Sequence, residues 1–174
     1  MPDDMTPVFE LAGFCAAEAL LNLSGKHETT RKPGEAALLP SVVIQNPAGK
    51  RASTIFDDVT QETFEKIEGL LDRFSPSDKF AVVTSDGYVT IDERKFDAIE
   101  LNGHRLSEPR QSFCIVIPYV HPEGDRPFGF TSPQIASYGG FDPDSVDMSE
   151  AFRRGRDSHA DAQRIWESFF RSEL

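Results

Sequence analysis

The sequence predicts an α+β domain in which helices pack on an antiparallel sheet. Three segments carry apolar residues at helical spacing, and two blocks of β-branched residues with turn dipeptides lie between them. Strands joined by short turns pair antiparallel, and helices placed between blocks of such strands define α+β rather than α/β. The expected order of elements is α-β-β-α-β-β-β-β-α, over one domain of residues 1–174 built from a hairpin and a meander.

The first helix is expected over residues 7–24. Thr6 can cap its start, Pro7 suits the first helical position, and Ser24-Gly25 is a typical stop. Its polar residues form only a thin stripe of Glu10, Glu18 and Asn22. Such a helix is buried on nearly all sides, or half of it meets another subunit.

A hairpin is expected next. Residues 26–37 are polar and form a loop, residues 38–45 form a strand, and the turn residues 46–49 lead into a second short strand near 52–56.

The second helix begins at Asp57 and Asp58, whose charges suit the positive end of a helix. Its apolar residues recur at 3-4-3 spacing: Phe64, Ile67, Leu71 and Phe74. Ser75-Pro76 ends it.

The meander follows. Asp86-Gly87 lies between two β-branched runs, which predicts a hairpin turn there. A strand over 96–101 is expected to end at Asn102-Gly103, and the doubly apolar run 113–120 reads as a central strand. His121 and the turn 92–95 then lie at the same end of the sheet.

The segment 121–148 is expected to be a long irregular loop rich in proline, glycine and aromatic residues. After it, a helix begins near Ser149 or, beyond Gly155, near Ser158. Its apolar stripe comprises Ile165, Trp166, Phe169 and Phe170, which favours docking on the sheet.

This order of elements, over roughly residues 6–172, resembles that of profilin-like and roadblock-type domains in topology. The resemblance implies a protein-binding scaffold that forms dimers.

The chain is acidic, with 29 Asp and Glu against 18 Lys and Arg and a formal net charge of −11. Such a charge repels nucleic-acid phosphates and anionic lipids, so neither is an expected partner. Residues 57–100 are the most acidic stretch, which is a solubilising surface or a docking face for a basic partner. The acidic start and the absence of a long apolar run predict a cytoplasmic protein.

The two cysteines, Cys15 and Cys114, lie in apolar contexts and are expected as buried free thiols, with a disulfide between them as the alternative. The sequence contains no glycine-rich phosphate loop, no dinucleotide turn and no zinc-type cysteine spacing, so no cofactor is expected. The favoured hypothesis is a non-catalytic protein-interaction module: an adaptor, an inhibitor or an assembly subunit. Its partner is another protein or a second copy of itself.

Four aromatic residues of segment 121–148 are the predicted partner-binding residues: Phe128, Phe130, Tyr138 and Phe141. Aromatic side chains need a surface to bury against. Phe128 and Phe130 share a face of an extended chain, so they act as one unit. That unit anchors another chain, or it attaches the loop to its own domain.

The rival hypothesis is a small metal-dependent hydrolase that uses the strand end near His121. Glu123 and Asp125 follow His121, and the turn that carries Asp92 lies at the same end. One imidazole among carboxylates suits a divalent cation or general acid–base work. Because basic residues occur in the same place, a solvated salt-bridge cluster is the alternative.

Overall fold

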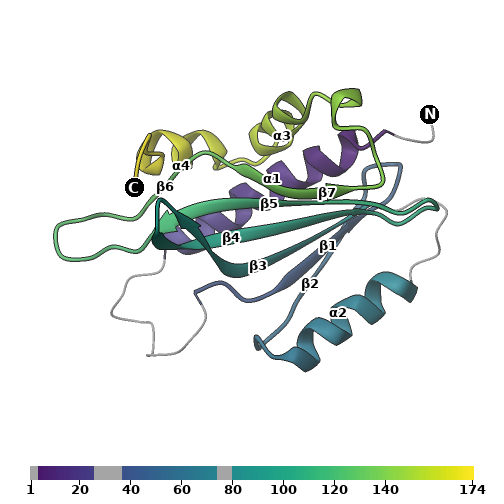
Figure 1. Cartoon of the computed structure of the whole chain (residues 1–174), viewed down its shortest axis with the longest axis horizontal. Coiled ribbons are helices and arrows are strands. Elements are labelled where there is room, and N and C mark those ends of the chain that lie inside the picture. The colour runs from purple at the N-terminus through teal and green to yellow at the C-terminus, as the bar shows by residue number, and fades with distance from the viewer. Residues whose placement is uncertain (1–3, 26–36, 74–79) are drawn as a thin grey trace.

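The computed structural model describes residues 4–25, 37–73 and 80–174 of the chain (Figure 1). Its helices are α1 (Thr6–Ser24), α2 (Gln61–Arg73), α3 (Met148–Asp157) and α4 (Ala162–Phe169), with a 3-10 turn at Pro143–Ser145. Its strands are β1 (Ser41–Gln45), β2 (Arg51–Ile55), β3 (Phe80–Ile91), β4 (Arg94–Arg105), β5 (Gln111–Val120), β6 (Gly129–Phe130) and β7 (Gln134–Gly139). The α+β prediction is confirmed.

The strands form one seven-stranded antiparallel sheet in the order β2-β1-β3-β4-β5-β6, and β7 pairs with β5 beside β6. β3, β4 and β5 follow one another in the sequence and pair in the same order in the sheet, as in the expected meander. The hairpin β1–β2 extends this meander through the pairing of β1 with β3.

The predicted turns at Asp86-Gly87 and Asn102-Gly103 are wrong, because β3 and β4 run straight through them. The turn lies instead at Asp92 and Glu93, whose φ angles are +48° and +67°. Gly87 makes room for the Glu100 side chain, and Gly103 lies under the Phe113 ring. These glycines therefore permit close packing within strands, which the dipeptide signal does not distinguish from a turn.

Asp86 has its own role in the strand. Its carboxylate accepts hydrogen bonds from the Tyr119 hydroxyl at 2.8 Å and from the Ala37 N–H at 3.2 Å. Tyr119 lies on β5, so this aspartate connects strands that are not adjacent in the sheet.

One face of the sheet carries α1, α3 and α4 (Figure 1). The expected buried helix is confirmed in α1, whose apolar side chains pack against alternate residues of β3, β4 and β5 such as Val82, Leu101 and Ile117. Phe9 stacks on Phe113 with ring centroids 4.0 Å apart. This cluster is the main core of the protein.

The opposite face carries α2 alone among the described helices (Figure 1). Ile67 and Leu71 of α2 pack on Val42, Ala81 and Val83. Val82 belongs to the main core while its neighbours belong to this second cluster, as the alternation of a strand requires. The second cluster is small and covers the β1–β3 side of the sheet.

The segment 121–148 is less irregular than expected, since it contains β6, β7 and the 3-10 turn. Both strands are short, and every residue of β7 is exposed, so no apolar alternation marks them in the sequence. The two starts considered for the last helix correspond to two helices. Asp147 caps α3 by accepting the Glu150 N–H at 3.0 Å, and α4 begins at Ala162.

Candidate binding groove beside the edge strand

A concave surface with a largely apolar lining lies between α1 and the hairpin β1–β2. α1 covers the middle of the sheet, no other described helix covers this hairpin on the same face, and a groove of about 470 Å³ lies between α1 and the hairpin. Most of its wall is apolar: α1 provides Phe14, Cys15 and Ala19, and the sheet provides Val43 and Ile55.

β2 forms the free edge of the sheet on this side. Among the residues that the structure describes, it pairs with β1 only, and all five of its residues are exposed. Ile55 is an apolar side chain that is 70 % exposed. A sheet edge of this kind presents unpaired N–H and C=O groups and is a template for a further strand.

The register identifies which backbone groups point outward. The Phe56 N–H donates to the Pro40 carbonyl at 2.9 Å, and the Asn46 N–H donates to the Lys50 carbonyl at 3.0 Å. Hydrogen-bonded pairs alternate with non-bonded pairs in an antiparallel ladder. The backbone N–H and C=O groups of the even-numbered residues of β2 therefore point toward β1. Those of Arg51, Ser53 and Ile55 point away from β1, beyond the edge of the sheet.

The same three residues line the groove with their side chains. Arg51, Ser53 and Ile55 thus offer both free backbone groups and one side-chain face to a chain lying beside β2. Ser53 is small and lies between the two longer side chains. A large side chain of an added strand could pass over it into the groove.

Arg51 is held in a defined position at one end of the groove. Its guanidinium lies 4.1 Å from the centroid of the Phe14 ring, and its Nε donates to Gln45 Oε1 at 2.7 Å. Within the part of the chain that the structure describes, no carboxylate forms an ion pair with it.

Cys15 forms part of the groove wall but is not a nucleophile there. Burial raises the pKa of its thiol to about 12, against a smaller lowering effect of the Arg51 charge. The thiol is therefore neutral at physiological pH, and thiols react as thiolates.

The predicted partner-binding residues divide into two groups. Phe128 and Phe130 are 3 % and 0 % exposed and belong to the main core, where Phe130 contacts Trp166 edge-on at 4.9 Å between ring centroids. Tyr138 is 54 % exposed, and Phe141 is partly buried. Of these four side chains, Tyr138 is the one that a partner reaches most directly.

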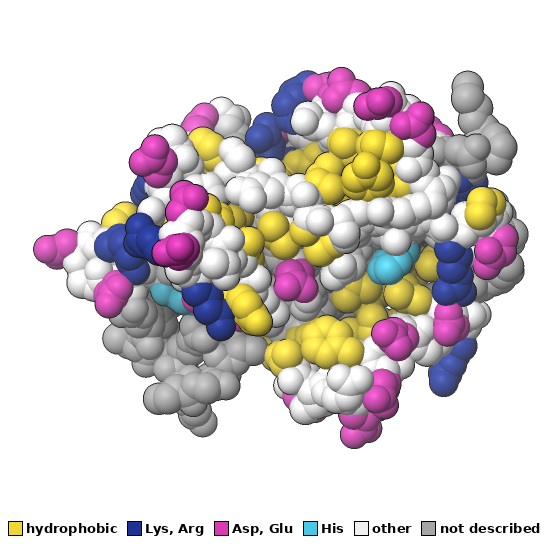
Figure 2. Space-filling model, viewed as in Figure 1, with side chains coloured by type: hydrophobic (Ala, Val, Ile, Leu, Met, Phe, Trp, Pro, Cys, Tyr) yellow, Lys and Arg dark blue, Asp and Glu magenta, His cyan; other side chains and the backbone are white. Residues whose placement is uncertain are grey.

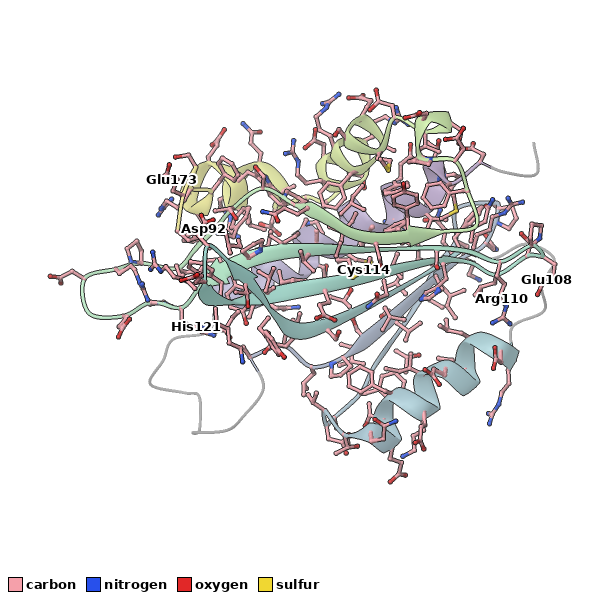
Figure 3. The ribbon with its side chains drawn as sticks, viewed as in Figure 1. Asp92, Glu108, Arg110, Cys114, His121 and Glu173 are labelled. Carbon is pink, nitrogen blue, oxygen red and sulfur yellow. The ribbon has the colours of Figure 1, made fainter. Side chains whose placement is uncertain are left out.

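The predicted metal ligands are only partly brought together. His121 Nε2 lies 3.5 Å from Asp97 Oδ2, while Glu123 pairs with Arg126 at 2.8 Å. Asp92 and His121 lie at the same end of the sheet, as expected (Figure 3). Across residues 4–25, 37–73 and 80–174, no three His, Cys, Asp or Glu side chains are grouped closely enough to hold a metal ion.

On the sheet face beside α2, a histidine and acidic side chains lie among hydrophobic ones (Figure 2). Asn102 lies directly opposite Cys114, and His104 lies opposite Ser112. Both cysteines are free, but only Cys15 is buried, so the expectation of a buried Cys114 is wrong. It fails because the apolar run 113–120 has one face against α1, and none of the described helices covers its other face.

The electrostatics of this face oppose nucleophilic catalysis. Burial, with a contribution from the Glu100 charge, raises the pKa of the Cys114 thiol. Burial and the Arg110 charge lower the pKa of His104. Both shifts favour neutral forms, the reverse of a thiolate–imidazolium pair.

A second hollow of about 340 Å³ lies between β7 and α3. Two arginines stand at its rim, but both are paired: Arg153 binds Glu150 at 2.7 Å, and Arg156 binds Asp157 at 2.7 Å. This hollow offers less free charge than the groove beside β2.

The chain matches no protein-family model, no curated protein and no solved structure at a significant level. The topological resemblance to profilin-like and roadblock-type domains therefore stays a prediction. None of the helices in the described ranges has the length and apolar character needed to cross a membrane.

Sequence reasoning identified the hairpin but not the groove. The alternation of Arg51, Ser53 and Ile55 is visible in the sequence, but it is too short to indicate binding. The decisive property is that β2 is an edge strand. It is one because β1 uses its other side to pair with β3, which lies about 40 residues later in the chain, roughly the length of a supersecondary unit.

Proposed function

We propose that this protein is a non-catalytic protein-interaction module, an adaptor, inhibitor or assembly subunit of the cytoplasm. It binds an extended segment of another protein as an additional strand alongside β2. The observation that carries this proposal is the exposed edge strand β2 with an apolar groove directly beside it.

The two parts of this surface complement each other. Backbone hydrogen bonds along an edge provide affinity without sequence preference, and a side-chain pocket beside the edge provides selectivity. The outward backbone groups and the groove-facing side chains belong to the same residues, Arg51, Ser53 and Ile55. One bound strand therefore engages both.

Ser53→Pro tests this mode of binding. Proline removes the outward N–H of Ser53 without removing a bond to β1, because Ser53 faces away from β1 in the ladder. Displayed random linear peptides selected against the wild-type chain serve as probes. Their affinity for Ser53→Pro should fall about tenfold or more, measured by calorimetry.

Ser53→Ala is the matched control, since it keeps the backbone donor, and its affinity should equal that of the wild type. Amide hydrogen exchange gives a second reading: bound peptide should slow exchange at Arg51, Ser53 and Ile55. If the selected peptides bind folded Ser53→Pro with unchanged affinity, or leave exchange at these residues unchanged, strand addition at β2 is refuted. A wild-type dimer that Ser53→Pro converts to a monomer, with no peptide selected, would replace the proposal with self-association.

A further inference from the structure

We infer that Arg51 recognises an acidic side chain of the segment bound at β2. Over five consecutive residues, from the N- to the C-terminal side, this segment has large apolar residues at its first and third positions and Asp or Glu at its fifth. Its second and fourth positions accept any residue. This inference rests on the proposed function and specifies its ligand. It is carried by the position and the environment of Arg51.

Arg51 is oriented before any ligand arrives. The Phe14 ring supports one face of the guanidinium, and Gln45 accepts from Nε, so the two terminal nitrogens remain for a further acceptor. A planar guanidinium held in this way suits a carboxylate, which can accept two parallel hydrogen bonds. Little side-chain entropy is lost when it binds.

The guanidinium of Arg51 has no carboxylate partner among the described residues, unlike that of several other arginines. Several other arginines are engaged by carboxylates of the protein itself, for example Arg110 with Asp72 at 2.8 Å and Arg154 with Glu10 at 2.8 Å, whereas Arg94 rests on the Phe96 ring much as Arg51 rests on Phe14. Glu18, which also lines the groove, is bound to His159 at 2.9 Å. In a chain with a net charge of −11, an arginine without a carboxylate partner among the described residues is a local site for negative charge.

The period of the strand then sets the ligand pattern. Residues directly opposite each other in an antiparallel pair share a face of the sheet. The ligand residues opposite Ile55, Ser53 and Arg51 therefore lie on the groove face and follow each other at every second position. Ile55 and the space over Ser53 favour large apolar residues, and Arg51 favours Asp or Glu.

We take the added strand to be antiparallel to β2, because every pair of named strands in this sheet is antiparallel. An antiparallel strand meets Ile55 first and Arg51 last, which places the acidic residue on the C-terminal side of the two apolar residues. The side chains between them point to the other face and are not selected by the groove.

Selections with two forms of the full chain test this inference. Peptides selected against the wild type should carry Asp or Glu at the position opposite Arg51, and exchange of that residue for Asn or Gln should weaken binding about tenfold or more. Selection against Arg51→Glu should instead enrich Lys or Arg at the same position. Lys50→Glu is the matched control, because it changes the net charge equally at the neighbouring residue, which precedes β2 and does not line the groove.

The outcomes separate this inference from the proposed function. Peptides that depend on the Ser53 N–H but show no acidic preference would refute the role of Arg51 and leave strand addition intact. Equal losses in Arg51→Glu and Lys50→Glu would also refute it, because general charge repulsion would then explain both. If no selected peptide depends on the Ser53 N–H, the proposed function itself fails.

Discussion

The two faces of the sheet are built very differently. On one face, α1, α3 and α4 enclose a large core in which α1 is buried on nearly all sides. On the other face, α2 covers a small cluster around Ile67 and Leu71, and half-buried polar residues such as Asn102 and His104 lie on the strands beyond it. Most of the buried apolar side chains therefore lie on the first face, and on the second face α2 covers only part of the sheet.

This difference explains where the groove forms. The helices of the large face sit over β3, β4 and β5, and none of the described helices lies over the same face of β1 and β2. The hairpin is supported from the α2 side through Val42. The groove is therefore the margin of the large core, with rigid walls from α1 and an open edge at β2.

The largest expected loss of stability comes from a substitution in the main core, on the face that carries α1, α3 and α4. Phe130 is fully buried, and its ring contacts Phe128, Trp166 and Phe170. Phe130→Ala should lower the free energy of unfolding by about 3–5 kcal/mol, because it leaves a cavity among rings that cannot close around it. Urea denaturation followed by circular dichroism measures this.

Tyr138→Ala is the control for Phe130→Ala, since its ring is 54 % exposed, and it should change the free energy of unfolding by about 1 kcal/mol or less. Equal effects of the two substitutions would contradict the assignment of Phe130 to the core. A partner lost only in Tyr138→Ala would place the loop's partner-binding function at that residue.

Substitution of one helical glycine on each face compares how tightly the helices pack there. Gly155 of α3 lies against the backbone of α1 at Glu10, so an added Cβ would clash with main-chain atoms, whereas Gly69 of α2 has nothing near its Cβ position. Gly155→Ala should destabilise the protein by about 3 kcal/mol, at the upper end of overpacking effects. Gly69→Ala should stabilise it by about 0.5–1 kcal/mol through better helix propensity.

Thermal unfolding of both variants checks these signs. The comparison of the faces would be wrong if Gly155→Ala were neutral, because α1 and α3 would then separate without cost. A destabilised Gly69→Ala would show that α2 packs more tightly on the sheet than its open surroundings indicate.

The smallest expected effect concerns the two thiols, one on each face. Cys15 is 3 % exposed, and Cys114 is half-buried on the open face. In the folded protein, Cys114 should react with iodoacetamide faster than Cys15, although more slowly than an exposed cysteine, because its pKa is raised. Mass spectrometry of the labelled peptides gives both rates, and faster labelling of Cys15 would contradict the burial of α1.

The sequence predicted the features that depend on local periodicity, whereas the caps expected at Thr6 and at Asp57-Asp58 are wrong, because α1 has no side-chain cap bond and α2 begins at Gln61. The apolar circumference of α1, the Phe64-Ile67-Leu71 stripe of α2 and the central strand around Ile115 are confirmed, because burial of apolar side chains imposes those patterns directly. The turn at Asp86-Gly87 was wrong, because a glycine that permits close packing has the same sequence signal as a glycine that permits a turn.

By itself, the sequence determined the α+β class, the buried first helix and the acidic character of this protein, since each follows from composition and periodicity along the chain. Only the tertiary structure decided that Phe130 faces inward, that Cys114 faces an open surface and that Arg51, Ser53 and Ile55 form a free edge beside a groove. These properties depend on which strand pairs with which and on where helices stop covering the sheet. Such pairings join residues far apart in the chain, and no local pattern records them.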